Sequence, residues 1–371
     1  MKKAGIITIH NAYNYGAVLQ SLALMKKIQA LGVDCEFIDF DPPATQRVRK
    51  IFIKDYSFSG ILRNIRALFA YKTLKKRKKA FDAFIDKYYN LSILRYETLE
   101  DFEKSNLDYD YCITGSDQTF CLHLRNKVED MKPYFLPYVQ GKKISYASSF
   151  GEKIKLNTEQ EELWIAERLK EYNSLSVREY KSAEYVKRLT GGEPQVVLDP
   201  TLLLCANEWA DFEKPINIKG EYILFYSVLS NKKIVKAVRA LAKKTGLKIL
   251  APHLKNHYEL FDNFIRMDHI GPGGFLSLIK NAKYVVTTSF HGTVFAINYQ
   301  KPFSSMLLGE GNRISSILST LCLENRLAKN TEDLIVQYQT EIDYNVPQAL
   351  LKKERQQSLN FLEKALDAQK D

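Results

Sequence analysis

The sequence lacks the features that mark a membrane-spanning, secreted or zinc-binding protein. No stretch approaches the roughly 18 consecutive apolar residues of a membrane span. The N-terminal "MKKAGIITI" carries lysines and an apolar run, but the run is short and no cleavage-type site follows, so we expect a first strand there. The five cysteines are scattered, odd in number and without a CxxC pair. This usage favours a reducing cytoplasm and argues against a zinc site.

The composition is that of a soluble globular protein of more than one domain. Hydrophobic residues make up 45% and charged residues 26% of the 371 residues. A chain of this length exceeds one ordinary core, so two domains are expected. There is no GxGxxG dinucleotide fingerprint, and there is no motif typical of RNA binding.

The net charge of +11 is concentrated in one segment, residues 47–79. This segment holds twelve Lys/Arg and one acid, so the remainder of the chain is close to neutral. Within 60–70, the apolar residues share one face of an expected helix, with Arg63 and Arg66 off that face. The pattern resembles an interfacial helix on an anionic membrane, where each basic residue contributes about 1 kcal/mol. The alternatives are a helix whose apolar face packs on the protein, and nucleic-acid binding, which no aromatic interleaving supports.

Apolar runs alternate with helical patterns in two successive series. The expected strands are 5–9, 35–40, 109–114, 143–151, 174–179 and 195–200 in the first series, and 222–228, 247–250, 284–288 and 302–307 in the second. Such alternation predicts parallel sheets with right-handed crossovers. We therefore expect an α/β protein with two Rossmann-like domains, 1–205 (with the basic insertion 47–79) and 220–345, and a helix in 346–371 that packs on the first. The site should lie at the carboxyl ends of the strands, in a cleft between the domains.

One ionisable residue, His291, lies within the otherwise apolar stretch "YVVTTSFHGTVFAINYQKPF" (284–303), where a strand should become a helix. Ser289 is placed to cap that helix, and Gly292 and Thr293 follow in its first turn. Free N–H groups and the helix dipole make this point a ready anion site. A histidine there can donate a proton to an anionic substrate. The alternative is a histidine hydrogen-bonded to a nearby carbonyl.

Three further polar loops follow expected strands. In "HNAYNYG" (10–16), Asn14 and Gly16 are candidates for left-handed turn conformations. In "GSDQ" (115–118), Ser116 or Asp117 could cap a helix, or Asp117 could accept a proton from a sugar hydroxyl. "SVRE" places Arg178 at a strand end, where it could bind a carboxylate or phosphate or form an ion pair with Glu179 or another acid. Arg313, after "GEGN", is a weaker candidate of the same kind.

Taken together, these motifs resemble the polysaccharide pyruvyl transferase family. The stretches that carry the resemblance are "HNAYNYGAVLQSLAL", "YDYCITGSDQ", "KISYASSFG", "SVREYKSAEYV", "VVLDPTLLL" and "NAKYVVTTSFHGTVFAINYQKPF", in order from residue 10 to residue 303. Family members often continue the "GSDQ" motif with a Val-Trp-Asn-like run, whereas this chain reads "TFCLHL" (119–124). Because that region would touch the acceptor, the resemblance does not assign the acceptor sugar.

The resemblance implies a glycosyltransferase-B-like fold, phosphoenolpyruvate as donor and a sugar as acceptor. The product would be a pyruvate ketal across two hydroxyls in a capsule or exopolysaccharide. His291 and Arg178 match residues that handle the donor. We predict that Ser289, Gly292, Thr293 and Arg313 complete the donor site, and that Asp117 is the general base. The residues expected at the acceptor are Asn11, Asn14, Tyr15, Gly16, Ser116 and Gln118.

This reading requires no metal and no cofactor besides the donor substrate. A polyprenyl-pyrophosphate-linked acceptor at the inner face of the plasma membrane would give the basic segment 47–79 a purpose. Two alternatives remain open. One is a nucleotide-sugar-dependent glycosyltransferase of the same fold, which would not need Arg178. The other is an inactive membrane-associated scaffold, which would not need both Arg178 and His291.

Overall fold

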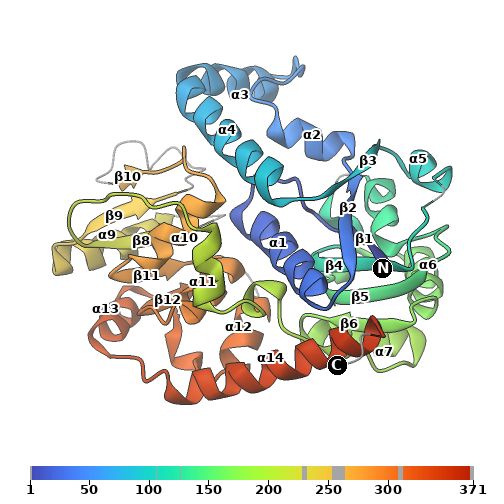
Figure 1. Cartoon of the computed structure of the whole chain (residues 1–371). Coiled ribbons are helices and arrows are strands. Elements are labelled where there is room, and N and C mark those ends of the chain that lie inside the picture. The colour runs from blue at the N-terminus through green and yellow to red at the C-terminus, as the bar shows by residue number, and fades with distance from the viewer. Residues whose placement is uncertain are drawn as a thin grey trace. The chain divides into compact units, whose positions relative to one another are not determined.

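The computed structural model describes residues 2–105, 107–125, 127–227, 232–252, 264–307 and 312–367. The chain divides into two compact units. The first comprises Met1–Lys50, Ile85–Leu204 and Lys353–Asp371, and the second comprises Ile51–Phe84 and Cys205–Lys352. Each unit is built on one parallel sheet flanked by helices (Figure 1).

The first unit contains a seven-stranded sheet in the order β3-β2-β1-β4-β5-β6-β7. Its strands are β1 (Lys3–Ile7), β2 (Asp34–Phe40), β3 (Leu91–Tyr96), β4 (Tyr111–Asp117), β5 (Lys142–Ser148), β6 (Ser174–Val177) and β7 (Gln195–Val196). Its helices are α1 (Tyr15–Ala30), α2 (Pro43–Arg49), α5 (Leu99–Glu103), α6 (Glu159–Lys170) and α7 (Tyr180–Thr190). The chain moves outward from β1 to β3 and then returns to build the other half from β4, so strand order reverses between β1 and β4.

The second unit repeats this plan with a six-stranded sheet in the order β10-β9-β8-β11-β12-β13. Its strands are β8 (Tyr222–Tyr226), β9 (Lys248–Ala251), β10 (Phe264–Arg266), β11 (Tyr284–Thr287), β12 (Phe303–Met306) and β13 (Leu327–Ala328). Its helices are α3 (Phe58–Phe69), α8 (Ala206–Trp209), α9 (Lys232–Thr245), α10 (Pro272–Lys280), α11 (Phe290–Asn298), α12 (Asn312–Thr320) and α13 (Thr331–Gln339), together with most of α4 (Tyr71–Tyr88). Here the order reverses between β8 and β11.

Buried apolar faces of the strands explain both sheets. Ile7, Phe40 and Phe135 belong to the core of the first unit, and Phe225 and Val286 belong to that of the second. Strands buried on both faces read as continuous apolar runs, which is why most of them are visible in the sequence. By contrast, β3 lies at a sheet edge and is largely exposed, and it was not predicted as a strand from the sequence.

Most of the basic segment, from Ile51 onward, belongs to the second unit, although the sequence interpretation had placed the segment in the N-terminal domain. The buried Arg77 donates a hydrogen bond to the carbonyl of Asp268 at 3.3 Å. Gly271 lies so close to this segment that a Cβ there would come within 2.7 Å of the Ala80 carbonyl oxygen. These contacts join residues far apart in sequence, so local patterns could not indicate them.

The stretch at the expected boundary between the two domains, near 205–221, is an integral part of the second unit. It contains α8, and Trp209 at the end of this helix is fully buried with its ring 5.2 Å from that of Phe295. The strand expected at 195–200 is also shorter, because Asp199 caps a 3-10 turn by accepting a hydrogen bond from the Thr201 N–H.

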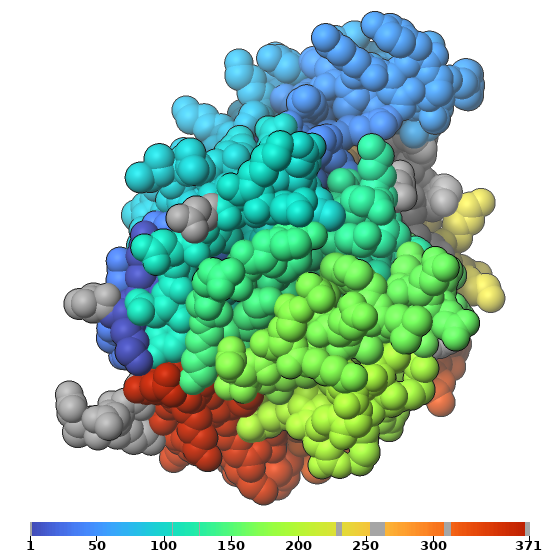
Figure 2. Space-filling model, turned by 90° about the vertical axis from the view of Figure 1, so that its right-hand side faces the viewer, coloured from blue at the N-terminus to red at the C-terminus, as the bar shows by residue number. Residues whose placement is uncertain are grey.

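The C-terminal helix α14 (Asn345–Ala365) contributes its last turns to the first unit. Ser358 accepts a hydrogen bond from the Leu198 N–H at 2.9 Å, and Arg355 donates to the Leu202 carbonyl at 2.7 Å. The C-terminal segment, red in Figure 2, lies against the green residues of this unit. No helix in the described residues combines the length and the apolarity needed to cross a bilayer.

Candidate active site

His291 lies where strand order reverses in the second unit, at the carboxyl ends of β8 and β11. Hydroxyl groups gather at this point. Ser227 and Thr288, which follow β8 and β11, share a hydrogen bond at 2.7 Å between their Oγ atoms. Thr287 donates from Oγ1 to the carbonyl of Tyr226 at 2.6 Å and so ties the two strand ends together. Ligands of doubly wound sheets bind at such switch points.

Helix α11 begins at this point with the predicted cap. Ser289 is the N-cap residue, and its Oγ accepts a hydrogen bond from the Gly292 N–H at 3.4 Å. His291 is in the first turn, largely buried, with its ring edge-on to that of Phe290. Thr293 is fully buried and bonds the Ser289 carbonyl and the Ser305 hydroxyl, so its side chain fixes the helix to the sheet.

Gly292 is required by packing rather than by a turn. A Cβ at this position would lie 2.2 Å from Thr287 Oγ1 and 2.9 Å from Cδ1 of Tyr226. The Cβ direction therefore points at strands β8 and β11, and glycine allows the first turn of α11 to approach them closely. This contact holds the His291 backbone against the switch point.

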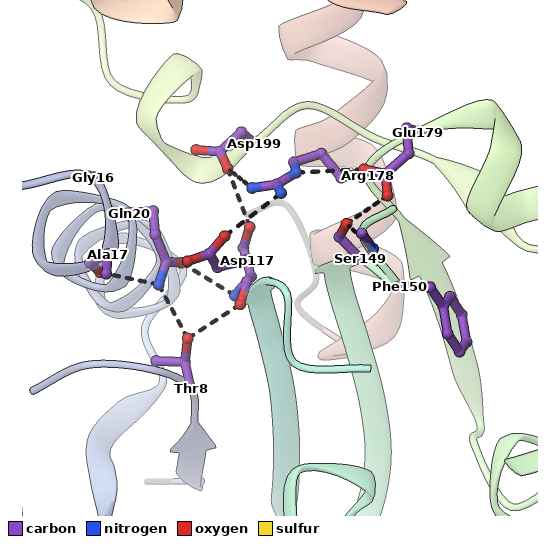
Figure 3. A network of polar contacts seen from close by, with 12 residues as sticks. Thr8, Gly16, Ala17, Gln20, Asp117, Ser149, Phe150, Arg178, Glu179 and Asp199 are labelled. Atoms are coloured by element: carbon purple, nitrogen blue, oxygen red, sulfur yellow. Dashed lines mark hydrogen bonds and ion pairs between the residues drawn. The ribbon is translucent and has the colours of Figure 1, made fainter. Parts of the chain in front are cut away.

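The first unit contains a second polar site, built around Arg178, which directly follows β6. Its Nη1 donates to Asp199 Oδ2 at 2.8 Å, and it lies 3.5 Å from carboxylate oxygens of both Asp117 and Glu179 (Figure 3). Ser116 donates from Oγ to the same oxygen of Asp199 at 3.2 Å. The cluster gathers the ends of β4 and β6 and the loop after β7.

The charge of this cluster is negative. Burial by itself would lower the pKa of Arg178, but attraction by Asp199, Glu179 and Asp117 outweighs burial and raises its pKa above the usual value. The guanidinium therefore remains charged, and three carboxylates surround one cation. Such a site favours hydroxyl groups over an additional anion, because like charges in a buried site repel.

A hydrogen-bond network fixes the backbone beside Asp117. Gln20 of α1 accepts from the Ser116 N–H at 3.2 Å and donates to Thr8 Oγ1 at 3.0 Å, and Thr8 in turn donates to the Ser116 carbonyl at 3.2 Å. Asp117 has a φ of 71°, a left-handed conformation that aspartate adopts more readily than most residues. This network positions the carboxylate at the junction of β1 and β4, the switch point of this sheet.

Sequence reasoning had not included two residues of the cluster, Gln20 and Asp199, whereas the ion pair of Arg178 with Glu179 was one of its stated alternatives. Gln20 lies in "GAVLQS", where a polar residue interrupts the buried face of an apolar helix. Asp199 lies in "VVLDP", directly after an apolar run. A polar residue at either place is a signal that could have identified it.

Most of the predicted acceptor residues are buried or have structural roles. Asn14 is extended, with a φ of −124°, and caps α1 by accepting from the Gly16 and Ala17 N–H groups. Gly16 is buried within α1, so neither residue adopts the left-handed conformation expected for this loop. Ser116 and Asp117 form the end of β4 rather than a helix cap.

The other candidates lie as follows. Asn11 and Tyr15 are buried beside the end of β1, and Gln118 follows β4. Arg313 is half-buried in the first turn of α12, in the second unit. His291, Ser289, Gly292, Thr293 and Arg313 thus belong to the second unit, whereas Arg178, Asp117 and the acceptor candidates belong to the first. Within the described ranges, no group of three or more His, Cys, Asp or Glu residues is arranged to hold a metal ion.

Comparisons with known proteins place this architecture in context. MnaA from S. aureus in a co-structure with UDP is similar at a TM-score of 0.54 and 13% identity, over 100% of this chain and 98% of that chain. The UDP-GlcNAc 2-epimerase from Methanocaldococcus jannaschii gives 0.55 and 14%, over 93% and 94%. The epimerase from Neisseria meningitidis bound to UDP-GlcNAc gives 0.50 and 12%, over 99% of both chains.

At these identities the likeness concerns the fold alone: two parallel-sheet α/β domains of the glycosyltransferase-B type. The comparison with curated protein sequences gives no match. A family model described as polysaccharide pyruvyl transferase matches residues 14–306, which include both switch-point sites. The chain therefore belongs to the polysaccharide pyruvyl transferase family, a family of enzymes.

Proposed function

We propose that this enzyme transfers the pyruvyl group of phosphoenolpyruvate to two hydroxyls of a sugar, during synthesis of a bacterial cell-surface polysaccharide. The observation that carries the proposal is the hydroxyl-rich helix start at the switch point of the second unit. There Ser227, Thr288 and Ser289 surround the first turn of α11, which contains His291. In a chain of this family, such a point suits a small dianion.

The charges of the two units separate the substrates. Phosphoenolpyruvate carries a carboxylate and a phosphate, and three carboxylates already surround Arg178. We therefore assign the donor to the second unit and the acceptor hydroxyls to the first. The sequence interpretation gave Arg178 an anionic group of the donor; we now assign it the role of holding Asp117 in place.

The proposed chemistry uses one acid and one base. A sugar hydroxyl oxygen bonds to C2 of phosphoenolpyruvate, and the methylene carbon C3 receives a proton. The C2–O bond to phosphate breaks, a second hydroxyl bonds to C2 and its proton goes to the departing phosphate, so the products are the cyclic ketal and inorganic phosphate. His291 would supply the proton to C3, and Asp117 would accept the proton of the attacking hydroxyl. Neither step requires a metal.

We further propose that the acceptor is carried on a polyprenyl pyrophosphate and that the basic segment 47–79 binds the anionic membrane surface. Helix α3 has an outward apolar face: Phe58, Leu68 and Phe69 are 83%, 65% and 89% exposed, and Ile61 and Ile65 are exposed beside them. The spacing 58, 61, 65, 68, 69 is that of one helical stripe. The alternative that this stripe packs on the protein does not agree with these exposures.

The inward face of α3 is small and polar, the reverse of an ordinary surface helix. Asn64 bonds both the N–H and the carbonyl of Ile53, at 2.9 and 2.8 Å. Gly60 and Ala67 are buried, and a Cβ on Gly60 would lie 2.4 Å from the Asp55 carbonyl oxygen. Helix α3 is thus fixed to the protein by its polar side, which leaves the apolar stripe uncovered.

The next helix along the chain, α4, carries exposed basic residues. Lys72, Lys76 and Lys79 are exposed along one face of α4, and none of them forms an ion pair within the described part of the chain. An apolar stripe beside unpaired lysines is typical of an interfacial segment on anionic lipid. Flotation with phosphatidylcholine vesicles, with and without phosphatidylglycerol, tests this proposal.

We expect binding only to the anionic vesicles. Replacing all three lysines by glutamine should weaken binding by about 3 kcal/mol, or roughly 100-fold. The control is Ile93→Ser, which removes a fully exposed apolar side chain of the first unit. Equal binding to both kinds of vesicle, or to neither, would contradict the proposal.

Thermal unfolding with phosphoenolpyruvate, and with UDP-sugars in parallel, tests the donor. A ligand at about 100 times its Kd adds about 2.7 kcal/mol and should raise the Tm by several degrees. We expect a shift with phosphoenolpyruvate that His291→Ala reduces and the control His269→Ala, an exposed histidine of the same unit, does not. Stabilisation by a UDP-sugar alone would instead support the nucleotide-sugar-dependent glycosyltransferase.

A further inference from the structure

Buried polar atoms without a hydrogen-bond partner gather in one part of the first unit. Asn11 Nδ2, Asp41 Oδ1, Thr45 Oγ1, Thr119 Oγ1 and Arg125 Nε are buried, and none has a partner among the described residues. Asn11 is 6% exposed and Asp41 is 0% exposed. Buried polar groups in native proteins are nearly always bonded to protein, water or a ligand, so a cluster of this size requires an explanation.

All five atoms lie beyond the carboxyl ends of three adjacent strands. Asn11 follows β1, Asp41 and Thr45 follow β2, and Thr119 and Arg125 follow β4. Strand β1 pairs with β2 on one side and with β4 on the other. The five atoms therefore belong to the segments that follow the strands at the switch point, the place where doubly wound domains bind their ligands.

Asp41 is held so that one of its oxygens remains available. Its Oδ2 is paired with Arg49 and lies 3.7 Å from Arg95 Nη1, whereas Oδ1 is the atom without a donor. Arg95 also donates from Nε to Asp39 at 2.7 Å. The arginines thus offset the charge of Asp41 and fix its carboxylate, and a hydrogen-bond acceptor is left for another group.

Tyr134 is fully buried, and the charges of Asp41, Arg125 and Asp117 all act on its hydroxyl. Burial raises the pKa of Tyr134 to about 12, Arg125 acts to lower it, and Asp41, Asp130 and Asp117 act to raise it further. Four charged groups therefore act on one phenol, one from the loop after β2 and three from the end of β4 and the segment that follows it. Asp117, the residue assigned as the general base, is the last residue of β4, and Thr119 of the polar cluster follows it two positions later.

The functional groups match a neutral sugar. A sugar hydroxyl both donates and accepts, as do the two threonines, while Asn11 and Arg125 offer donors and Asp41 an acceptor. The charged groups named here are the carboxylates of Asp39, Asp41, Asp117 and Asp130 and the guanidinium groups of Arg49, Arg95 and Arg125. The Asp117 carboxylate also belongs to the negative cluster around Arg178. An acidic sugar would add a further negative charge, so the cluster favours an uncharged hexose.

We propose that Asn11, Asp41, Thr45, Thr119 and Arg125 form the pocket that recognises the acceptor hexose, with its reactive hydroxyls directed at Asp117. This inference rests on the proposed function for the identity of the reaction, but the pocket itself is defined by the first unit alone. Thr119 and Arg125 lie in and just after the stretch "TFCLHL", where the chain departs from the usual family pattern. The departure is therefore located in residues that select the acceptor.

The test uses two isosteric variants, Thr45→Val and Thr119→Val, of the full chain. Binding of p-nitrophenyl hexosides with gluco, galacto and manno configuration, and of the glucuronide, is measured by isothermal titration without phosphoenolpyruvate. We expect at least one neutral hexoside to bind more tightly than the glucuronide. Each variant should weaken that binding by about three- to tenfold, the effect of losing one hydrogen bond.

Stability separates a sugar pocket from a structural water site. Removing a hydroxyl that has no partner should leave the Tm unchanged within about a degree or raise it. The control is Thr114→Val, because the buried Thr114 hydroxyl donates to the Tyr134 carbonyl at 2.8 Å, and its loss should lower the Tm by several degrees. If both valine variants lower the Tm as this control does and hexoside binding is unchanged, ordered water alone occupies the site and the proposal fails.

The remaining outcomes distinguish failure of the proposed pocket from failure of the proposed donor. If no hexoside of the panel binds the wild type, the pocket is not a hexose site. If hexoside binding is lost in the variants while phosphoenolpyruvate fails to stabilise the wild type, the pocket stands and the donor assignment fails. If phosphoenolpyruvate stabilises the wild type and both variants equally while hexoside binding is unaffected, the proposed function stands and the pocket does not.

Discussion

Replacing Arg178 by methionine tests the central electrostatic feature of the first unit. The side chain of Arg178 is 2% exposed and faces the carboxylates of Asp199, Asp117 and Glu179 at 2.8, 3.5 and 3.5 Å. Methionine fills a similar volume but leaves three buried carboxylates without a cation. Removing one partner of a buried ion pair typically costs about 3–5 kcal/mol, a large share of the total stability of a domain.

The expected change in melting temperature follows from the size of the unit. A loss of 1 kcal/mol lowers the Tm by about 2–4 °C for a domain of this size, so Arg178→Met should lower it by about 6–20 °C. Calorimetry at neutral pH measures this. Arg178→Lys should recover only part of the loss, because an ammonium cannot reach three carboxylates in the manner of a planar guanidinium.

The pH dependence of the variant supplies the refutation. Without the arginine, the crowded carboxylates bind protons more readily in the folded variant than in its unfolded chain. The difference in stability between wild type and the variant should therefore become smaller as the pH falls from 7 towards 5. The reasoning would be refuted if the variant's Tm lay within about 2 °C of wild type, or if the Tm difference did not become smaller at lower pH. Either result would show that the buried carboxylates are not stabilised by Arg178.

Two further predictions concern one position in each unit. Gly292→Ala should cost about 1–3 kcal/mol, because the new methyl would meet Thr287 Oγ1 at 2.2 Å; Gly192→Ala, which meets nothing closer than 3.3 Å, is the control for calorimetry. If both alanines are tolerated equally, the close packing is wrong. Burial acts to raise the pKa of Asp39, but hydrogen bonds from His10 and an arginine outweigh it and lower the pKa below the usual value. Its contribution to stability is therefore present above the unfolded pKa of about 3.9 and is lost as pH falls through the lower folded value. Asp39→Asn should be less stable at neutral pH and should flatten acid unfolding below about pH 4; an unchanged acid limb would contradict this.

The local features of the fold were predictable because they depend on neighbouring residues. The strand before His291, the Ser289 cap and the start of α11 agree with the expectation from "TTSFHG". The edge strand β3 was not predicted, because a strand that is largely exposed has no continuous apolar run. The left-handed turn expected at Asn14 was wrong, because its side chain serves as a helix cap and holds the backbone extended.

The sequence by itself determined the family, the alternation of strands and helices, and the placement of His291 at a strand–helix junction. All three depend on local order along the chain, which a linear pattern records. Only the tertiary structure decided that Asp117, Glu179 and Asp199 surround Arg178, and that unpartnered polar atoms follow the three adjacent strands β2, β1 and β4. Those groupings depend on strand order in the sheet, and strand order is set by long-range packing that no local pattern contains.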